Sequence, residues 1–233
     1  MTISSNQPYY FPYIAYWQMI GASDLFLVGD DFAYMKHGWI ARNRILVGGG
    51  PQYFRVEVDH KSSFRLISDT LLSPSMNVSD KLKTVEMAYH EAPYFGDVFP
   101  LFERVLCNPE RRLVPFLEYS IREVCDYLGI TTPFGRTSDY PGNSALKREE
   151  RIYDLCVRTG ADRYINLPGG SALYHAEDFA RHGIELRFIR SRLTPYRQWG
   201  GPFVERLSIL DAMMFNSREQ LHAMLDDYDL VDG

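Results

Sequence analysis

The stretch that decides the fold is residues 2–31, TISSNQPYYFPYIAYWQMIGASDLFLVGDD. A strand-like run (2–5) leads through a turn into a short helix bounded by Pro12 and Gly21, and an apolar run (24–29) follows. A proline at the first helical position and a glycine just past the last one are typical helix boundaries. A strand, a helix and a second strand within so few residues predict a parallel crossover unit.

The last third of the chain repeats this alternation of helix and strand. The sequence predicts a helix, a strand, a helix and a strand at Lys147–Thr159, Asp162–Leu167, Leu173–Arg181 and Ile184–Arg190. Further helices are predicted at Ser79–Glu91, Arg112–Leu128 and from near Ser208 and Ser217. We therefore predict one α/β domain over residues 1–233, with a mainly parallel sheet flanked by helices, a helical middle segment and two C-terminal helices.

The binding site is expected at the carboxyl edge of this sheet, where open α/β sheets usually bind ligands. Gln7 would follow the first strand there, and Asp30 and Asp31 would follow the second. Residues 7–12, QPYYFP, place an amide and aromatic side chains such as that of Tyr10 between two prolines, which makes a rigid turn. We call this stretch the head segment.

Two other short motifs carry groups that can bind an anion. Arg42-Asn43-Arg44 sets two guanidiniums beside an amide, which can bind a carboxylate or phosphate; the alternative is a solvated strand with outward charges. Gly169-Gly170 lies between a predicted strand and a predicted helix, where backbone N–H groups can receive an anion; the alternative is a simple turn.

Candidates for acid–base chemistry are few. Ser208 and Asp211 permit a serine–acid interpretation, but Ser-x-x-Asp before an apolar run is also a helix-capping pattern, which we favour. The six histidines show no paired spacing typical of metal ligands, so no metal site is predicted. Asp31 and His90 are the candidates for a general base.

Composition excludes several classes of protein. The net charge of −5 and a pI near 5.7 give no general attraction to nucleic acid or to an anionic membrane. The sequence shows no signal peptide and no long apolar run, which predicts a cytoplasmic protein without a membrane segment. The three cysteines are odd in number, and Cys125 and Cys156 are expected to be buried thiols.

Many short runs, in the same order and spacing, make the chain resemble the WbqC-like protein family from about residue 3 to residue 216. They include QPYYFP, Gly38-Trp39 with Arg42-Asn43-Arg44, Gly169-Gly170 with Tyr174, Tyr196-x-Gln198 and Leu207-Ser208-Ile209-Leu210-Asp211. The family is named from O-antigen gene clusters, and a member has been suggested to transfer glycine onto a sugar.

The resemblance implies an aminoacyl or acyl transferase that forms an amide on an amino sugar or a small-molecule amine. Its donor would be an activated acyl group, such as a carrier-protein thioester or an aminoacyl-tRNA; no cofactor is specified. The expected substrate-binding residues are Gln7, Tyr10, Trp39, Arg42, Asn43, Arg44, Gly169, Gly170, Tyr174, Gln198, Ser208 and Asp211.

Two other functions compete with the transferase. One is a non-catalytic ligand-binding or assembly protein of a biosynthetic cluster, which the lack of an obvious catalytic pair permits. The other is an ATP-dependent amide ligase.

Overall fold

The computed structural model describes residues 1–169 and 174–232. Strand β1 (Thr2–Asn6), helix α1 (Ile14–Gly21) and strand β2 (Leu25–Val28) form the predicted crossover unit. The two strands pair in parallel, with Ile3 opposite Leu25. The N-terminal stretch therefore folds as its pattern of strand, helix and strand predicted.

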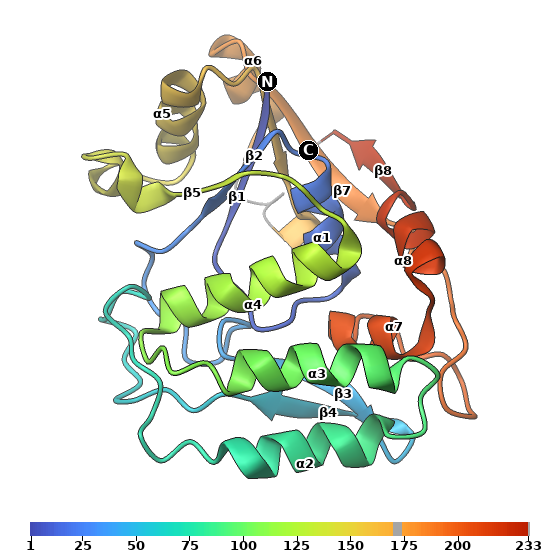
Figure 1. Ribbon diagram of the computed structural model, residues 1–233. Helices are drawn as coiled ribbons and strands as arrows, with labels where there is room; N and C mark the ends of the chain where they lie inside the picture. Colours follow the sequence, from blue (N-terminus) through green and yellow to red (C-terminus); the bar gives the residue numbers. More distant parts are fainter. Residues whose placement is uncertain (170–173, 233) are drawn as a thin grey trace.

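A six-stranded sheet lies in the upper half of the view in Figure 1. Its order is β5-β2-β1-β6-β7-β8, and the added strands are β5 (Phe134–Arg136), β6 (Arg163–Asn166), β7 (Glu185–Ser191) and β8 (Tyr228–Val231). Neighbouring strands run parallel except β7 and β8, which are antiparallel. The prediction of an α/β fold with a mainly parallel sheet is confirmed.

Helices cover both faces of the sheet because side chains alternate along its buried strands. In β2, Leu27 packs with α5 (Glu149–Thr159) and α6 (Ala176–Arg181), whereas Phe26 and Val28 belong to the larger core on the other face. That larger core also takes in α1, α4 (Leu113–Leu128), α7 (Ile209–Phe215) and α8 (Arg218–Leu225).

The helical middle segment consists of α2 (Val78–Tyr89), α3 (Phe95–Leu106) and α4, which lie in successive layers below the sheet in Figure 1. Helix α3 was not predicted, because Pro100 within it reads as a helix breaker. Buried side chains such as Val98, Leu101 and Val105 nevertheless recur at helical spacing. Their burial against α2 and α4 outweighs the loss of one backbone donor.

A hairpin of β3 (Arg42–Val47) and β4 (Gly50–Arg55) lies beside α2 and α7. Gly48 and Gly49 both have positive φ, 60° and 82°, which two-residue hairpin turns of this hand require. The two faces of the hairpin differ: Asn43, Ile45 and Phe54 are buried, while the opposite face carries Arg42, Arg44, Tyr53 and Arg55.

Candidate functional site at the switch point of the sheet

The head segment is held rigidly at the carboxyl end of β1. Phe11 is fully buried and has φ +43°, a left-handed conformation that costs energy for a non-glycine residue. Its carbonyl accepts hydrogen bonds from Asn43 Nδ2 at 2.9 Å and from Ser208 Oγ at 2.8 Å. Two buried polar side chains from distant segments therefore fix the strained turn.

A cavity of about 440 Å³ opens beside this turn, and we call it the switch-point cavity. The chain passes from β1 to β2 on one side of the sheet and later to β6 on the other, so the strand order reverses between β1 and β6. The residues that line the switch-point cavity are Ser5, Asn6, Gln7, Tyr9, Tyr13, Phe32, Met35, Trp39, Ile152, Tyr164, Asn166, Leu167, Gly169 and Tyr174. A reversal of strand order is the usual ligand site of such sheets.

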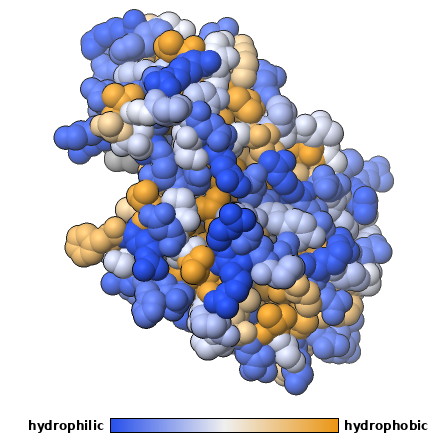
Figure 2. All heavy atoms as spheres, turned by 60° about the vertical axis from the view of Figure 1, so that its left-hand side comes forward, coloured by the Kyte–Doolittle hydropathy of each residue, from blue (hydrophilic) through white to orange (hydrophobic). Residues whose placement is uncertain are grey.

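In Figure 2 the left-hand side of Figure 1 comes forward, and the surface is indented there between an upper and a lower part. Apolar side chains, drawn in orange, are visible within this indentation and are surrounded by hydrophilic ones. The view agrees with a concave site whose walls are partly apolar.

The polar groups of the cavity are uncharged. Asn6, Gln7 and Asn166 provide side-chain amides where β1 and β6 end. Asn166 Oδ1 accepts a hydrogen bond from the Leu167 N–H at 2.7 Å, which fixes the orientation of this amide. Burial is the main cause that raises the pKa of the cavity's tyrosines, so their hydroxyls stay protonated at neutral pH. Aromatic walls with amides and hydroxyls suit a polar, neutral ligand group.

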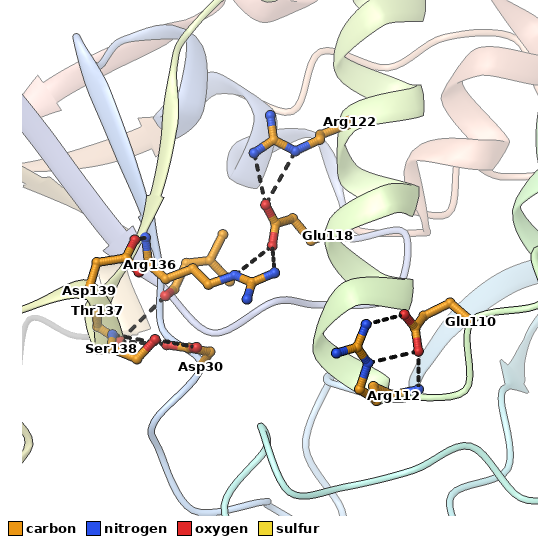
Figure 3. A network of polar contacts seen from close by, with 10 residues as sticks. Asp30, Glu110, Arg112, Glu118, Arg122, Arg136, Thr137, Ser138 and Asp139 are labelled. Atoms are coloured by element: carbon orange, nitrogen blue, oxygen red, sulfur yellow. Dashed lines mark hydrogen bonds and ion pairs between the residues drawn. The ribbon is translucent and has the colours of Figure 1, made fainter.

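Asp30 and Asp31, beside the cavity, are engaged with the segment that follows β5. Thr137 Oγ1 donates to Asp31 Oδ1 at 2.6 Å, and Ser138 Oγ donates to Asp30 Oδ2 at 2.7 Å. Figure 3 shows Thr137 and Ser138 directed toward Asp30, and it also shows the ion pairs that Arg136 and Arg122 make with Glu118 of α4. These contacts connect the end of β2 to β5 and α4.

Arg151 holds the other side of Asp31. Its Nη2 lies 2.6 Å and 2.7 Å from the two carboxylate oxygens, and its guanidinium lies 4.2 Å from the centre of the Phe32 ring. Arg151 Nε also donates to Asn143 Oδ1 at 2.9 Å. Both oxygens of Asp31 are thus bound by other side chains, and Asp31 does not line the cavity; its predicted role as a base stays a prediction.

Arg42, Asn43 and Arg44 do not converge on one ligand position. Alternation along β3 turns Asn43 inward to the head segment and both arginines outward. Arg42 Nε donates to the Gly38 carbonyl at 3.2 Å, whereas Arg44 Nη2 donates to the Arg206 carbonyl at 3.2 Å. Because these residues are adjacent in sequence, they were expected to bind one anion together. In the strand, the two guanidiniums contact different carbonyl groups and do not point toward one position.

Asp211 is the most enclosed carboxylate of the predicted set, with no exposed surface. Its oxygens accept hydrogen bonds from Tyr89 Oη at 2.8 Å, Tyr196 Oη at 2.6 Å and Gln198 Nε2 at 2.7 Å. Burial raises the pKa of Asp211, and these three donors, which act in the opposite direction, do not cancel it. Ser208 Oγ accepts from the Leu210 N–H, as expected of a helix cap, but the Asp211 side chain does not complete a capping box.

The remaining predicted residues fall into several places. Trp39, Gly169 and Tyr174 line the switch-point cavity together with Gln7, while Gly170 lies outside the described residues. Tyr10 is fully buried in the larger core. His90 is exposed at the end of α2, 3.7 Å from Glu91, and does not line the cavity. Its role as a base also stays a prediction.

Several cavity residues were missed by sequence reasoning, above all Asn6, Tyr9 and Asn166. Asn6 and Asn166 end two parallel strands, so the rule that located Gln7 contained the signal for both. Within the described part of the chain, no cluster of three or more His, Cys, Asp or Glu side chains is arranged to hold a metal ion. No described helix is both long and apolar enough to cross a membrane.

The structure defines an α/β protein with a cavity at a topological switch point of its sheet. The model of the WbqC-like protein family matches residues 7–223, and the chain belongs to that family. It is similar to the uncharacterized protein Rv1507c of Mycobacterium tuberculosis, at 28% identity over 213 residues that cover 90% of this chain and 91% of the relative. No solved structure matches the chain.

Proposed function

We propose that this protein is an aminoacyl or acyl transferase that forms an amide on an amino sugar or another small-molecule amine. The observation that carries the proposal is the switch-point cavity, whose aromatic walls and strand-end amides suit a polar, uncharged sugar-like group. Aromatic rings such as that of Trp39 can cover the flat face of a sugar, and Gln7 and Asn166 can bind its hydroxyls. The acceptor occupies this cavity with its amine directed outward.

The chemical step needs no covalent enzyme intermediate. The acceptor amine attacks the carbonyl carbon of an acyl thioester or ester, the new C–N bond forms, and the C–S or C–O bond to the carrier breaks. The proton that the amine loses ends on the departing thiolate or alkoxide. The protein's contribution is to position the amine and to donate hydrogen bonds to the oxyanion, for which side-chain amides and tyrosine hydroxyls are suitable donors.

A non-catalytic ligand-binding protein is the second candidate, and one observation favours it. Among the described residues that line the cavity there is no His, Cys, Lys, Asp or Glu. A site without these side chains can bind a sugar but contains no general base or nucleophile of the usual kinds. The two candidates agree on the ligand and differ on whether a product forms.

The test is product analysis by mass spectrometry after incubation of the full chain with amino sugars and activated aminoacyl or acyl donors. A transferase yields the acceptor heavier by the mass of one acyl residue, which is the mass of the free acid minus one water. Gln7→Ala and Asn166→Ala each remove a neutral hydrogen-bonding amide, so kcat/KM should fall about 2- to 12-fold per variant. Gln52→Ala, which truncates an exposed glutamine of the hairpin, is the matched control and should leave kcat/KM unchanged.

Binding of an amino sugar without any product would favour the binding protein. If amino sugars neither bind nor react, or if Gln52→Ala lowers activity as much as Gln7→Ala does, the cavity is not the acceptor site.

A further inference from the structure

A smaller concavity of about 150 Å³ is lined in part by the loop after β2, which also lines the switch-point cavity. It is rich in basic side chains, and we call it the basic pocket. Its lining comprises Tyr34, Lys36, His37, Gly38, Ala41, Arg42, Arg55, Val56 and Lys61. No acidic side chain is part of this lining, although acidic residues outnumber basic ones in the chain, 30 to 25.

The cations of the basic pocket lack carboxylate partners. Most arginines elsewhere pair with Asp or Glu, as Arg104 does with Glu123 at 2.9 Å. Within the described part of the chain, none of the basic side chains of the pocket makes an ion pair within 4.0 Å. They are those of Lys36, His37, Arg42, Arg55 and Lys61. Four permanent positive charges thus surround one small concavity without internal neutralisation.

Two features show that the pocket is built rather than a chance gathering of exposed charges. The guanidinium of Arg42 is fixed by the Gly38 carbonyl, at 3.2 Å, and by the Tyr53 ring, whose centre lies 4.5 Å from Arg42 Cζ. Arg42 and Arg55 also stand directly opposite each other in the hairpin register. Like charges directly opposite each other destabilise a hairpin by about a few tenths of a kcal/mol. Unfavourable pairs of this kind are typical of functional sites.

The basic pocket and the switch-point cavity share one loop. Phe32, Met35 and Trp39 line the cavity, while intervening residues of the same loop line the basic pocket. The ring centres of Trp39 and Tyr53 lie 6.2 Å apart, and Arg42 Cζ lies 4.5 Å from the centre of the Tyr53 ring. Arg42 Cζ is therefore at most 10.7 Å from the centre of the Trp39 ring, the sum of these two distances. That separation is short enough for one small molecule to contact both side chains.

We propose that the basic pocket binds the phosphate groups of a substrate whose neutral part occupies the switch-point cavity. Several cations around one position suit the high charge of a phosphate or diphosphate ester, which a single carboxylate would not match. A nucleoside-diphosphate amino sugar, as acceptor, and a coenzyme A thioester, as donor, both carry such esters. The assignment of the neutral part rests on the proposed function, whereas phosphate binding at the basic pocket does not.

The experiment is isothermal titration calorimetry of the full chain with inorganic pyrophosphate, a uridine diphosphate amino sugar and coenzyme A, in a phosphate-free buffer. Lys36→Gln and Lys61→Gln alter exposed side chains, so the fold should tolerate both. Each should weaken the binding of pyrophosphate about tenfold or more, because each removes a charged hydrogen-bond donor. Lys83→Gln on α2, an exposed lysine outside the pocket, is the matched control and should bind as the parent does.

Loss of affinity in Lys83→Gln equal to that in Lys36→Gln, or no effect of either pocket variant, overturns the inference. Tighter binding of the nucleotide sugar than of pyrophosphate supports it and assigns the pocket to the acceptor; tighter binding of coenzyme A supports it and assigns the pocket to the donor. Pyrophosphate binding that depends on Lys36 and Lys61 while no amide product forms would leave the basic pocket standing and refute only the transferase.

Discussion

Replacement of Asp31 by asparagine separates a structural from a chemical role for this carboxylate. Asp31 and Arg151 are only 11% and 10% exposed, and Arg151 Nη2 lies within 2.7 Å of both carboxylate oxygens. Thr137 donates a third hydrogen bond to the same group. Asp31→Asn keeps the size of the side chain but leaves the guanidinium of Arg151 enclosed without its negative partner.

The expected loss of stability follows from this burial. Breaking a buried ion pair by removing one partner costs about 3–5 kcal/mol, because the other charge stays desolvated. We expect about 3 kcal/mol, the lower end, since both side chains retain some exposure to water. For a chain of this length, that is a fall in Tm of about 6–12 °C.

A double-mutant cycle in urea unfolding measures the pairing itself. Asp31→Asn combined with Arg151→Met should be less destabilised than the sum of the single variants, with a coupling of about 1–3 kcal/mol. The exposed pair Arg104–Glu123 is the control, for which about 0.2–1 kcal/mol is expected. If Asp31→Asn instead unfolds at the parent's Tm and abolishes turnover, Asp31 acts in the reaction and the structural argument is wrong.

Three further predictions concern buried groups. Burial raises the pKa of Asp211 above its ordinary 3.8, so the unfolded chain ionises first as the pH rises. The Tm of the parent should therefore fall relative to that of Asp211→Asn as the pH rises above about 4, and a relative rise would contradict this assignment. Asn43→Ala leaves the buried Tyr10 carbonyl without a donor and the Phe11 carbonyl with Ser208 Oγ alone, and should cost about 1–3 kcal/mol in urea unfolding, whereas no change would show that the turn is held otherwise. Burial raises the thiol pKa of Cys125 and Cys156 to about 12. A thiol reagent should therefore label Cys107 alone in the folded protein and all three thiols after denaturation. Labelling of either buried thiol under native conditions would count against this packing.

Most strands of the sheet could be predicted from the sequence, because the patterns that favour a strand or a helix are local. An apolar run of a few residues, a glycine and a helical period decide whether a segment becomes a strand or a helix, and these signals recur along the chain. Where two signals conflict, the local pattern misleads: Pro100 obscured α3, whose buried side chains repeat at helical spacing. The edge strand β8 was also missed, since it is short and half-exposed and so lacks a strong pattern.

The site was only partly predictable, because the direction of a side chain depends on its element. Arg42, Asn43 and Arg44 are adjacent in the chain, yet the alternation of a strand separates the amide from the guanidiniums. Tyr10 was expected at the ligand and lies in the core, where its ring centre is 5.0 Å from that of Phe54 and 6.4 Å from that of Phe116. The partners of Arg42 in the basic pocket, Lys36 and Lys61, come from loops whose path no local signal specifies.

The head segment and the loop that follows β2 position different side chains around the two concavities, and this arrangement bears on ligand specificity. Asn43 and Ser208 fix the head segment at the Phe11 carbonyl, and Tyr16 Oη donates to the Gln7 carbonyl at 3.0 Å, so the backbone that carries the Gln7 side chain is held in place. The loop places Trp39 at the switch-point cavity and Lys36 at the basic pocket, so a ligand that reaches both contacts one continuous piece of chain. Joining two weak contacts in one molecule makes the second contact intramolecular. An intact phosphorylated substrate should therefore bind more tightly than its sugar and its phosphate group offered separately, which discriminates against free sugars without any charged group in the cavity itself.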